Sequence, residues 1–118
     1  MRIEKFVFGP VGTNCYIVIN EMTSECFAVD MADCPQEFVK HIKDAGLCVK
    51  ALLLTHGHFD HIGAIDELVE KYNCPVYIHQ DDYEMIYNDQ LNLSNYYGEL
   101  KIKSKVTAID KNIDIGDF

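Results

Sequence analysis

The chain has 118 residues, of which 48% are hydrophobic, so it can bury the core of one domain, and residues 1–118 are predicted to form a single domain. Ten basic against nineteen acidic residues give a formal net charge of −9, which excludes nucleic acid and anionic membranes as partners held by bulk electrostatics. Charges interrupt the apolar residues of the first segment, and neither a signal peptide nor a membrane span is predicted.

The cysteines are odd in number and form no Cys-x-x-Cys pair, which is typical of free thiols in a reducing compartment and predicts a cytoplasmic protein. They are Cys15, Cys26, Cys34, Cys48 and Cys74. Cys15 and Cys26 fall in predicted strands and are interpreted as small core residues.

The first third of the chain predicts three strands and a helix. Residues 3–8, 15–19 and 26–29 are strand-like, and the turn-rich segment 20–25 makes the last two a hairpin. Pro35 suits the first turn of a helix and Gly46 suits its end. The apolar stripe between them is Phe38, Ile42 and Ala45. His41 on the same helix is interpreted as a surface or boundary residue.

The remainder alternates between strands and helices. Residues 51–54 form an apolar run without alternation, which indicates a strand covered on both faces. Helical spacing of apolar residues predicts a helix over 62–72, followed by a strand over 76–78 ending at His79 and a third helix around 82–88. Residues 90–104 are either a lid or substrate loop or a plain connecting loop. Residues 105–109 predict a final edge strand.

A dense group of metal-binding side chains follows the strand over 51–54, in the sequence Thr-His-Gly-His-Phe-Asp-His of residues 55–61. In extended backbone, residues two apart point to the same side, so His56 and His58 can converge on one cation. Gly57 between them allows close approach. Asp60 and His61 follow the turn into the next helix and project differently. An isolated histidine is more often a packed side chain, but four polar side chains at the end of a buried strand destabilise it unless they share a charge partner.

This run resembles the HxHxDH signature of the metallo-β-lactamase-fold hydrolases, and residues 9–18 with Val29 and Asp30 are similar to the opening strands of the glyoxalase II-like branch. The resemblance implies that His56 and His58 bind a first metal, and Asp60 and His61 a second. Zinc suits these donors first, with iron or manganese as alternatives. Asp30 is interpreted either as an acceptor that orients a ligand imidazole or as a turn residue.

The family's later ligands have no counterpart before Phe118, so the resemblance implies an amino-terminal, truncated portion of a longer domain. The predicted fold class is α/β (α+β), half of a four-layer αββα sandwich, with a mostly antiparallel or mixed sheet and helices on one face. An apolar sheet face left exposed predicts self-association. His79 is the one histidine after His61, at a strand end where sites gather, but the family pattern gives it no role as a ligand.

The resemblance implies a metal-dependent hydrolase similar to hydroxyacylglutathione hydrolase, acting on a small thioester or related ester. A divalent cation lowers the pKa of bound water to about 7, which supplies hydroxide, and Asp60 would orient the attacking water. One alternative is an iron-dependent persulfide dioxygenase of the same fold. Another is a catalytically incomplete half-domain that acts as an interaction module, because the chain alone lacks ligands that the family carries.

Overall fold

A computed structural model of the chain describes residues 1–55, 57–88, 90–94 and 102–109, and in these segments six strands form one sheet. The strands are β1 (Arg2–Phe8), β2 (Thr13–Asn20), β3 (Glu25–Val29), β4 (Cys48–Leu54), β5 (Val76–His79) and β6 (Thr107–Ile109). They lie side by side in chain order, with β1 to β3 antiparallel and β3 to β6 parallel. The mixed sheet, the hairpin and the edge position of the last strand confirm the sequence predictions.

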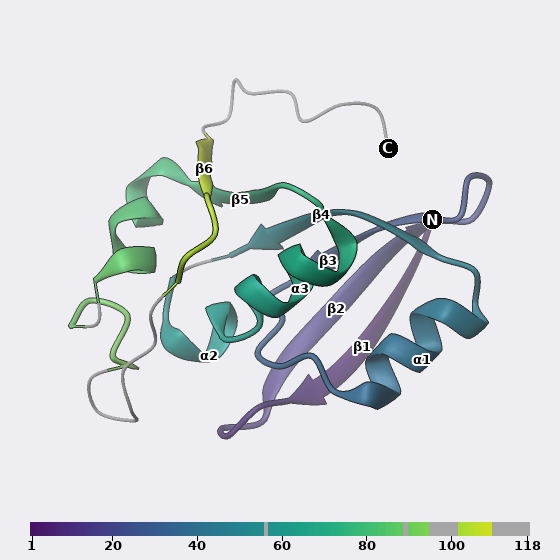
Figure 1. Cartoon of the computed structure of the whole chain (residues 1–118), viewed down its shortest axis with the longest axis horizontal. Helices are drawn as coiled ribbons and strands as arrows, with labels where there is room; N and C mark the ends of the chain where they lie inside the picture. The colour runs from purple at the N-terminus through teal and green to yellow at the C-terminus, as the bar shows by residue number, and fades with distance from the viewer. Residues whose placement is uncertain (56, 89, 95–101, 110–118) are drawn as a thin grey trace.

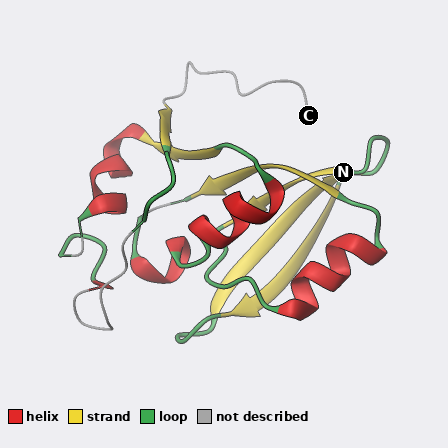
Figure 2. Cartoon of the chain, in the orientation of Figure 1, coloured by secondary structure: helices red, strands yellow, loops and turns green. Residues whose placement is uncertain are grey.

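Helices cover one face of this sheet. In Figures 1 and 2, α1 (Gln36–Asp44), α2 (Phe59–Ile62) and α3 (Ile65–Tyr72) lie in front of the strands. Apolar side chains from α1 and α3 pack on alternate residues of the strands, and the innermost are at most 2% exposed. These are Cys15, Ile17, Ile19, Cys26, Ala28, Phe38, Leu52, Ile65 and Leu68. The helix layer on one face, predicted as half of an αββα sandwich, is confirmed.

The two cysteines predicted to be core residues are fully buried. Cys15 and Cys26 each have 0% exposure, and burial raises the pKa of the Cys26 thiol to about 12. His41 of α1 lies at the boundary, as predicted: its Nε2 is 2.7 Å from Glu4 Oε1 and its ring is 5.6 Å from that of Phe6. These residues contribute to the core and its boundary, and the candidate metal-binding side chains are in the segment after β4.

The predicted single helix over 62–72 is wrong, because the chain forms two helices with a break at Gly63 and Ala64. The Ala64 amide donates to Met31 O at 3.2 Å instead of continuing the first helix. A Cβ on Gly63 would lie 2.4 Å from Ala32 O, so the backbone here packs directly on the loop after β3. Sequence periodicity detects the apolar faces of both helices but not this contact.

The third predicted helix, around 82–88, is a 3-10 helix, η1 (Gln80–Tyr87), and starts earlier. The side chain of His79 accepts a hydrogen bond from the Asp81 amide at 3.2 Å and so caps η1. None of the helices in the described segments is long and apolar enough to cross a membrane.

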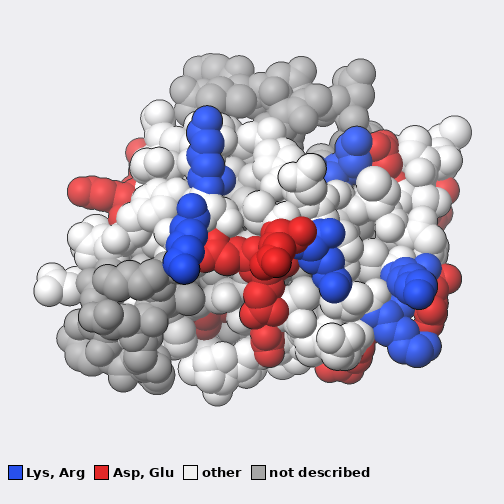
Figure 3. All heavy atoms as spheres, viewed as in Figure 1, with Lys and Arg blue, Asp and Glu red and all other residues white. Residues whose placement is uncertain are grey.

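The strand residues that alternate with the core residues form the second face of the sheet, here called the open sheet face. Its apolar members are partly exposed, and the strand register brings them side by side. They are Tyr16, Val18, Phe27, Val29, Leu53 and Tyr77. Ile3 of β1 pairs with Val18 on the same face and is 63% exposed. By contrast, charged side chains gather over α3 on the helix-covered face (Figure 3).

We propose that the open sheet face makes the isolated chain associate with itself, because a contiguous apolar patch of this kind is stabilised by being covered. Ile3→Lys places a charge on this face and should weaken association in sedimentation equilibrium. Met22→Lys is the matched control, since Met22 is 96% exposed in the turn between β2 and β3. A monomeric wild-type chain at all concentrations, or equal effects of both substitutions, would contradict the proposal.

The segment before β6 is held to α3 by the carboxylate of Asp66. Asp66 accepts hydrogen bonds from the Ser104 amide at 2.8 Å, the Ser104 hydroxyl at 2.6 Å and the Lys103 amide at 3.0 Å. Partial burial alone would raise the pKa of Asp66, but the hydrogen bonds from Ser104 and Lys103 outweigh it, and the pKa is lowered. Tyr87 adds a second anchor, donating to Ser104 O at 2.9 Å and accepting from the Val106 amide at 3.1 Å.

This lowered pKa makes stability depend on pH in a defined direction. A carboxylate whose folded pKa lies below its unfolded value of about 3.9 stabilises the fold at neutral pH, and that contribution disappears as pH falls through the folded pKa. Asp66→Asn should therefore lower the free energy of unfolding at pH 7 by about 1–2 kcal/mol and flatten its acid dependence. Urea titrations at several pH values measure this, with the exposed Glu70→Gln on the same helix expected to match wild type.

Candidate metal centre

The motif after β4 spans a change from extended to helical backbone, as the sequence predicted. His58 is at the N-cap of α2 with φ −66° and ψ 150°, whereas Asp60 and His61 lie within the helix. The His61 amide donates to His58 O at 2.9 Å and closes this first turn. His58 therefore projects from extended backbone and the last two side chains from helical backbone. His56 lies outside the described residues, so its convergence with His58 stays a prediction.

The imidazole of His61 lies between two carboxylates. Its Nδ1 is 3.1 Å from Asp30 Oδ2, and its Nε2 is 3.2 Å from Asp60 Oδ2. Asp30 is 4% exposed, and its two oxygens also accept from the Thr55 amide at 2.7 Å and the Thr55 hydroxyl at 2.5 Å. Asp30 thus links the beginning and the end of the motif. The interpretation of Asp30 as a turn residue agrees with its left-handed backbone, with φ 55°, while its role as an acceptor for a ligand imidazole stays a prediction.

Thr13 is a member of this network that the sequence analysis missed. Its hydroxyl donates to Asp60 Oδ2 at 3.0 Å from the first residue of β2, and Thr13 is 5% exposed. A hydroxyl at the start of a predicted strand, in the segment that carries the family resemblance, was the available signal. The 47-residue separation from Asp60 hid the contact.

The donor chemistry of this pair fits a bound cation. The His61 ring faces a carboxylate with each nitrogen, Asp30 at Nδ1 and Asp60 at Nε2, and a carboxylate beside one ring nitrogen is typical of metal-binding histidines. Carboxylate oxygens on both sides of the ring make these surroundings electrostatically favourable for a bound cation. Within the described segments, no three histidine, cysteine or acidic side chains already converge on one point. Metal ligation by His56, His58, Asp60 and His61 therefore stays a prediction.

Gly57 lets η1 pack directly on the motif. A Cβ on Gly57 would lie 2.6 Å from Met85 Cβ and 3.3 Å from Asp82 O, distances that no side chain tolerates without movement. The sequence analysis assigned Gly57 to close approach by a metal or substrate. The structure shows that η1 makes this close approach and packs beside Gly57.

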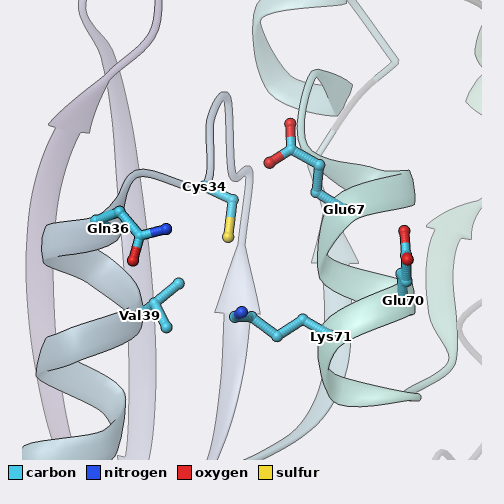
Figure 4. A pocket seen from close by; sticks show the side chains of 6 residues that line it. All are labelled: Cys34, Gln36, Val39, Glu67, Glu70 and Lys71. Atoms are coloured by element: carbon cyan, nitrogen blue, oxygen red, sulfur yellow. The ribbon is translucent and has the colours of Figure 1, made fainter.

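A separate hollow of about 460 Å³ lies between α1 and α3 (Figure 4). Its lining contains no residue of the motif: it is Cys34, Gln36, Val39, Glu67, Glu70 and Lys71. Burial raises the pKa of the Cys34 thiol, which therefore stays protonated and unreactive at neutral pH. His79 also has a different role from the motif histidines, since its Nδ1 accepts a hydrogen bond from the Asp81 amide in the cap of η1.

Comparison of the chain with models of known protein families agrees with the fold and the motif described above. The model of the Metallo-beta-lactamase superfamily matches residues 8–117. The chain belongs to the metallo-beta-lactamase superfamily. The resemblance predicted from the HxHxDH run is thereby confirmed at the level of the superfamily.

Two curated relatives are similar to this chain. Probable metallo-hydrolase YqgX of Bacillus subtilis (strain 168) is 34% identical over 122 residues, covering 100% of this chain and 57% of the relative. A hydroxyacylglutathione hydrolase of Bdellovibrio bacteriovorus is 35% identical over 71 residues, covering 60% of this chain and 28% of that protein. The chain therefore spans little more than half the length of its B. subtilis relative.

Two solved structures share the fold over 95% of this chain. The BLEG-1 B3 metallo-beta-lactamase superposes with a TM-score of 0.84 at 27% identity, over 54% of its own length. TTHA1623 in a di-iron-bound form superposes with a TM-score of 0.77 at 29% identity, over 56% of its length. The second of these is a fold neighbour that holds metal ions.

The Thr13–Asp60 contact predicts a measurable effect on metal binding. Thr13→Val removes the hydroxyl while keeping the shape, and loss of a partner that orients a ligand typically weakens metal affinity about 10–100-fold. Thr13→Ser keeps the hydroxyl and is expected to bind zinc nearly as wild type does. Isothermal titration with zinc measures both variants, and equal affinities for Val and Ser would show that the hydrogen bond does not orient Asp60.

Proposed function

We propose that this chain is the amino-terminal part of a metal-dependent hydrolase that acts on a small thioester or related ester. The observation that carries the proposal is the pairing of His61 with Asp60 at 3.2 Å directly after a buried strand, with Asp30 on the other side of the ring. The similarity to a hydroxyacylglutathione hydrolase over 71 residues supports a thioester substrate. Superfamily membership supports the wider class of metallo-hydrolases.

In this proposal, His56 and His58 hold one divalent cation, and Asp60 and His61 hold a second, with zinc, iron or manganese suiting the mixed donors. A bound cation of this kind supplies Lewis acidity and lowers the pKa of water to about 7. The chain's own residues do the positioning.

Positioning falls to the residues behind the proposed ligands. Asp30 lies 3.1 Å from Nδ1 of the His61 ring and would orient it, because Thr55 donates hydrogen bonds to both Asp30 oxygens. Thr13 fixes the Asp60 carboxylate, whose free electron pairs can orient an attacking water. Both supports come from buried residues, so their geometry does not depend on the substrate.

An iron-dependent activity is the second candidate, and the di-iron-bound form of TTHA1623 favours keeping it. A persulfide dioxygenase would use the same opening motif with iron and oxygen. A third interpretation is an interaction module, since the chain spans 57% of its B. subtilis relative and an isolated half would hold metal weakly. Metal analysis of the purified chain separates this last case from the two enzymes.

Substitutions of the proposed ligands test the function. His61→Ala and Asp60→Asn should each lower the zinc content of the purified protein and reduce thioester hydrolysis at least 100-fold in the full-length parent, because each removes a proposed ligand. His79→Ala is the matched control, since His79 contacts Asp81 rather than the motif. Thioester turnover with added zinc, compared with oxygen uptake on a persulfide with added iron, distinguishes the two enzymes. Unchanged metal content in His61→Ala would contradict both.

A further inference from the structure

The turn at residues 90–94 contains a fully buried polar residue beside the motif. Asn92 is 0% exposed, although its neighbours Leu91 and Leu93 are 45% and 38% exposed. Leu93 has φ 69°, a left-handed conformation that is unfavourable for a leucine. A turn that buries an amide, exposes two leucines and strains its backbone is held by something other than apolar packing.

Hydrogen bonds account for the buried amide. The side chain of Asn92 donates through Nδ2 to Met85 O at 2.8 Å and accepts through Oδ1 from the Ser94 amide at 2.9 Å. Its backbone amide donates to Asn88 O at 3.0 Å, and its carbonyl accepts from the Phe59 amide at 2.7 Å. Asn92 therefore ties the end of η1 and its own turn to the first residue of α2.

The contact with Phe59 satisfies a need of α2. A helix leaves its first amides without partners, and a four-residue helix has little stability of its own. The usual partner is the N-cap side chain, but His58 makes no capping hydrogen bond. The carbonyl of Asn92 instead accepts from the first of these amides, that of Phe59, from a distant part of the chain.

The contact with Met85 supports the other side of the same loop. Met85 lies against Gly57, so the position of η1 limits where the backbone of residues 57–58 can lie. Asn92 holds η1 through Met85 O and α2 through the Phe59 amide. The side chain and the backbone of Asn92 thus connect η1 to α2, and the segment that carries His58, Asp60 and His61 is held by both contacts.

We propose that Asn92 is a positioning residue that caps α2 from outside the helix and holds the loop at residues 57–61 in the conformation that presents its ligands. This inference rests on the proposed function for its purpose, but the conformational statement can be tested without metal. Its consequence is that metal affinity depends on a residue that contacts no ligand side chain.

Asn92→Asp tests the proposal with almost no change of shape. The carboxylate keeps the acceptor for Ser94 but faces Met85 O with an oxygen instead of a donor, which separates η1 from the turn. We expect the Phe59 amide to exchange with solvent at least ten times faster by NMR, and Co²⁺ affinity to fall about 10–100-fold with an altered absorption spectrum. Asn92→Ala serves as the second variant should the aspartate prevent folding.

Leu93→Gly is the matched control in the same turn, because glycine accepts a φ of 69° and leaves every hydrogen bond of Asn92 intact. It should leave both Phe59 exchange and Co²⁺ affinity unchanged. Unchanged Phe59 exchange in the Asn92 variants, or faster exchange without weaker Co²⁺ binding, would overturn the proposal. A wild-type chain that binds no Co²⁺ rejects the proposed function, while the exchange measurement still decides whether Asn92 holds the loop.

Discussion

The contact on which the site depends is the placement of one imidazole between two carboxylates. His61 reaches Asp30 with one ring nitrogen and Asp60 with the other, at 3.1 and 3.2 Å. Carboxylates on both sides of one ring make the surroundings negative, so the arrangement favours a cation. Thr55 restrains the buried Asp30, because it donates one hydrogen bond to each of its oxygens.

The surrounding fold supports this contact by bringing the ends of three strands together. Thr13 comes from the start of β2, Asp30 follows β3, and the motif follows β4. The parallel pairing of β3 with β4 places the ends of both strands at one edge of the sheet. Ligand groups gather at such edges because the loops there are free to vary while the strands below stay fixed.

Much of this structure could be predicted from the sequence, and the parts that could not have a common cause. The alternation in β2 and the unbroken apolar run of β4 indicate their burial locally, and the spacing of the histidines supports the superfamily resemblance, while metal binding stays a prediction. Thr13 and Asn92 are different. Each acts on the motif through a contact between residues far apart in the chain, and neither residue type distinguishes a site from an ordinary turn. The break at Gly63 likewise depends on the loop of Met31 and Ala32, which no helical periodicity encodes.

The sheet also runs in the order of the chain, from β1 at one edge to β6 at the other. Every new strand therefore pairs with the one synthesised just before it, and no strand waits for a later one to be inserted between its neighbours. The antiparallel pairs β1–β2 and β2–β3 are close in the chain, whereas each parallel pair from β3 to β6 closes over a longer connection, and such pairing lengthens the conformational search. In a nascent chain with this order, each strand can pair as soon as its own residues have been made.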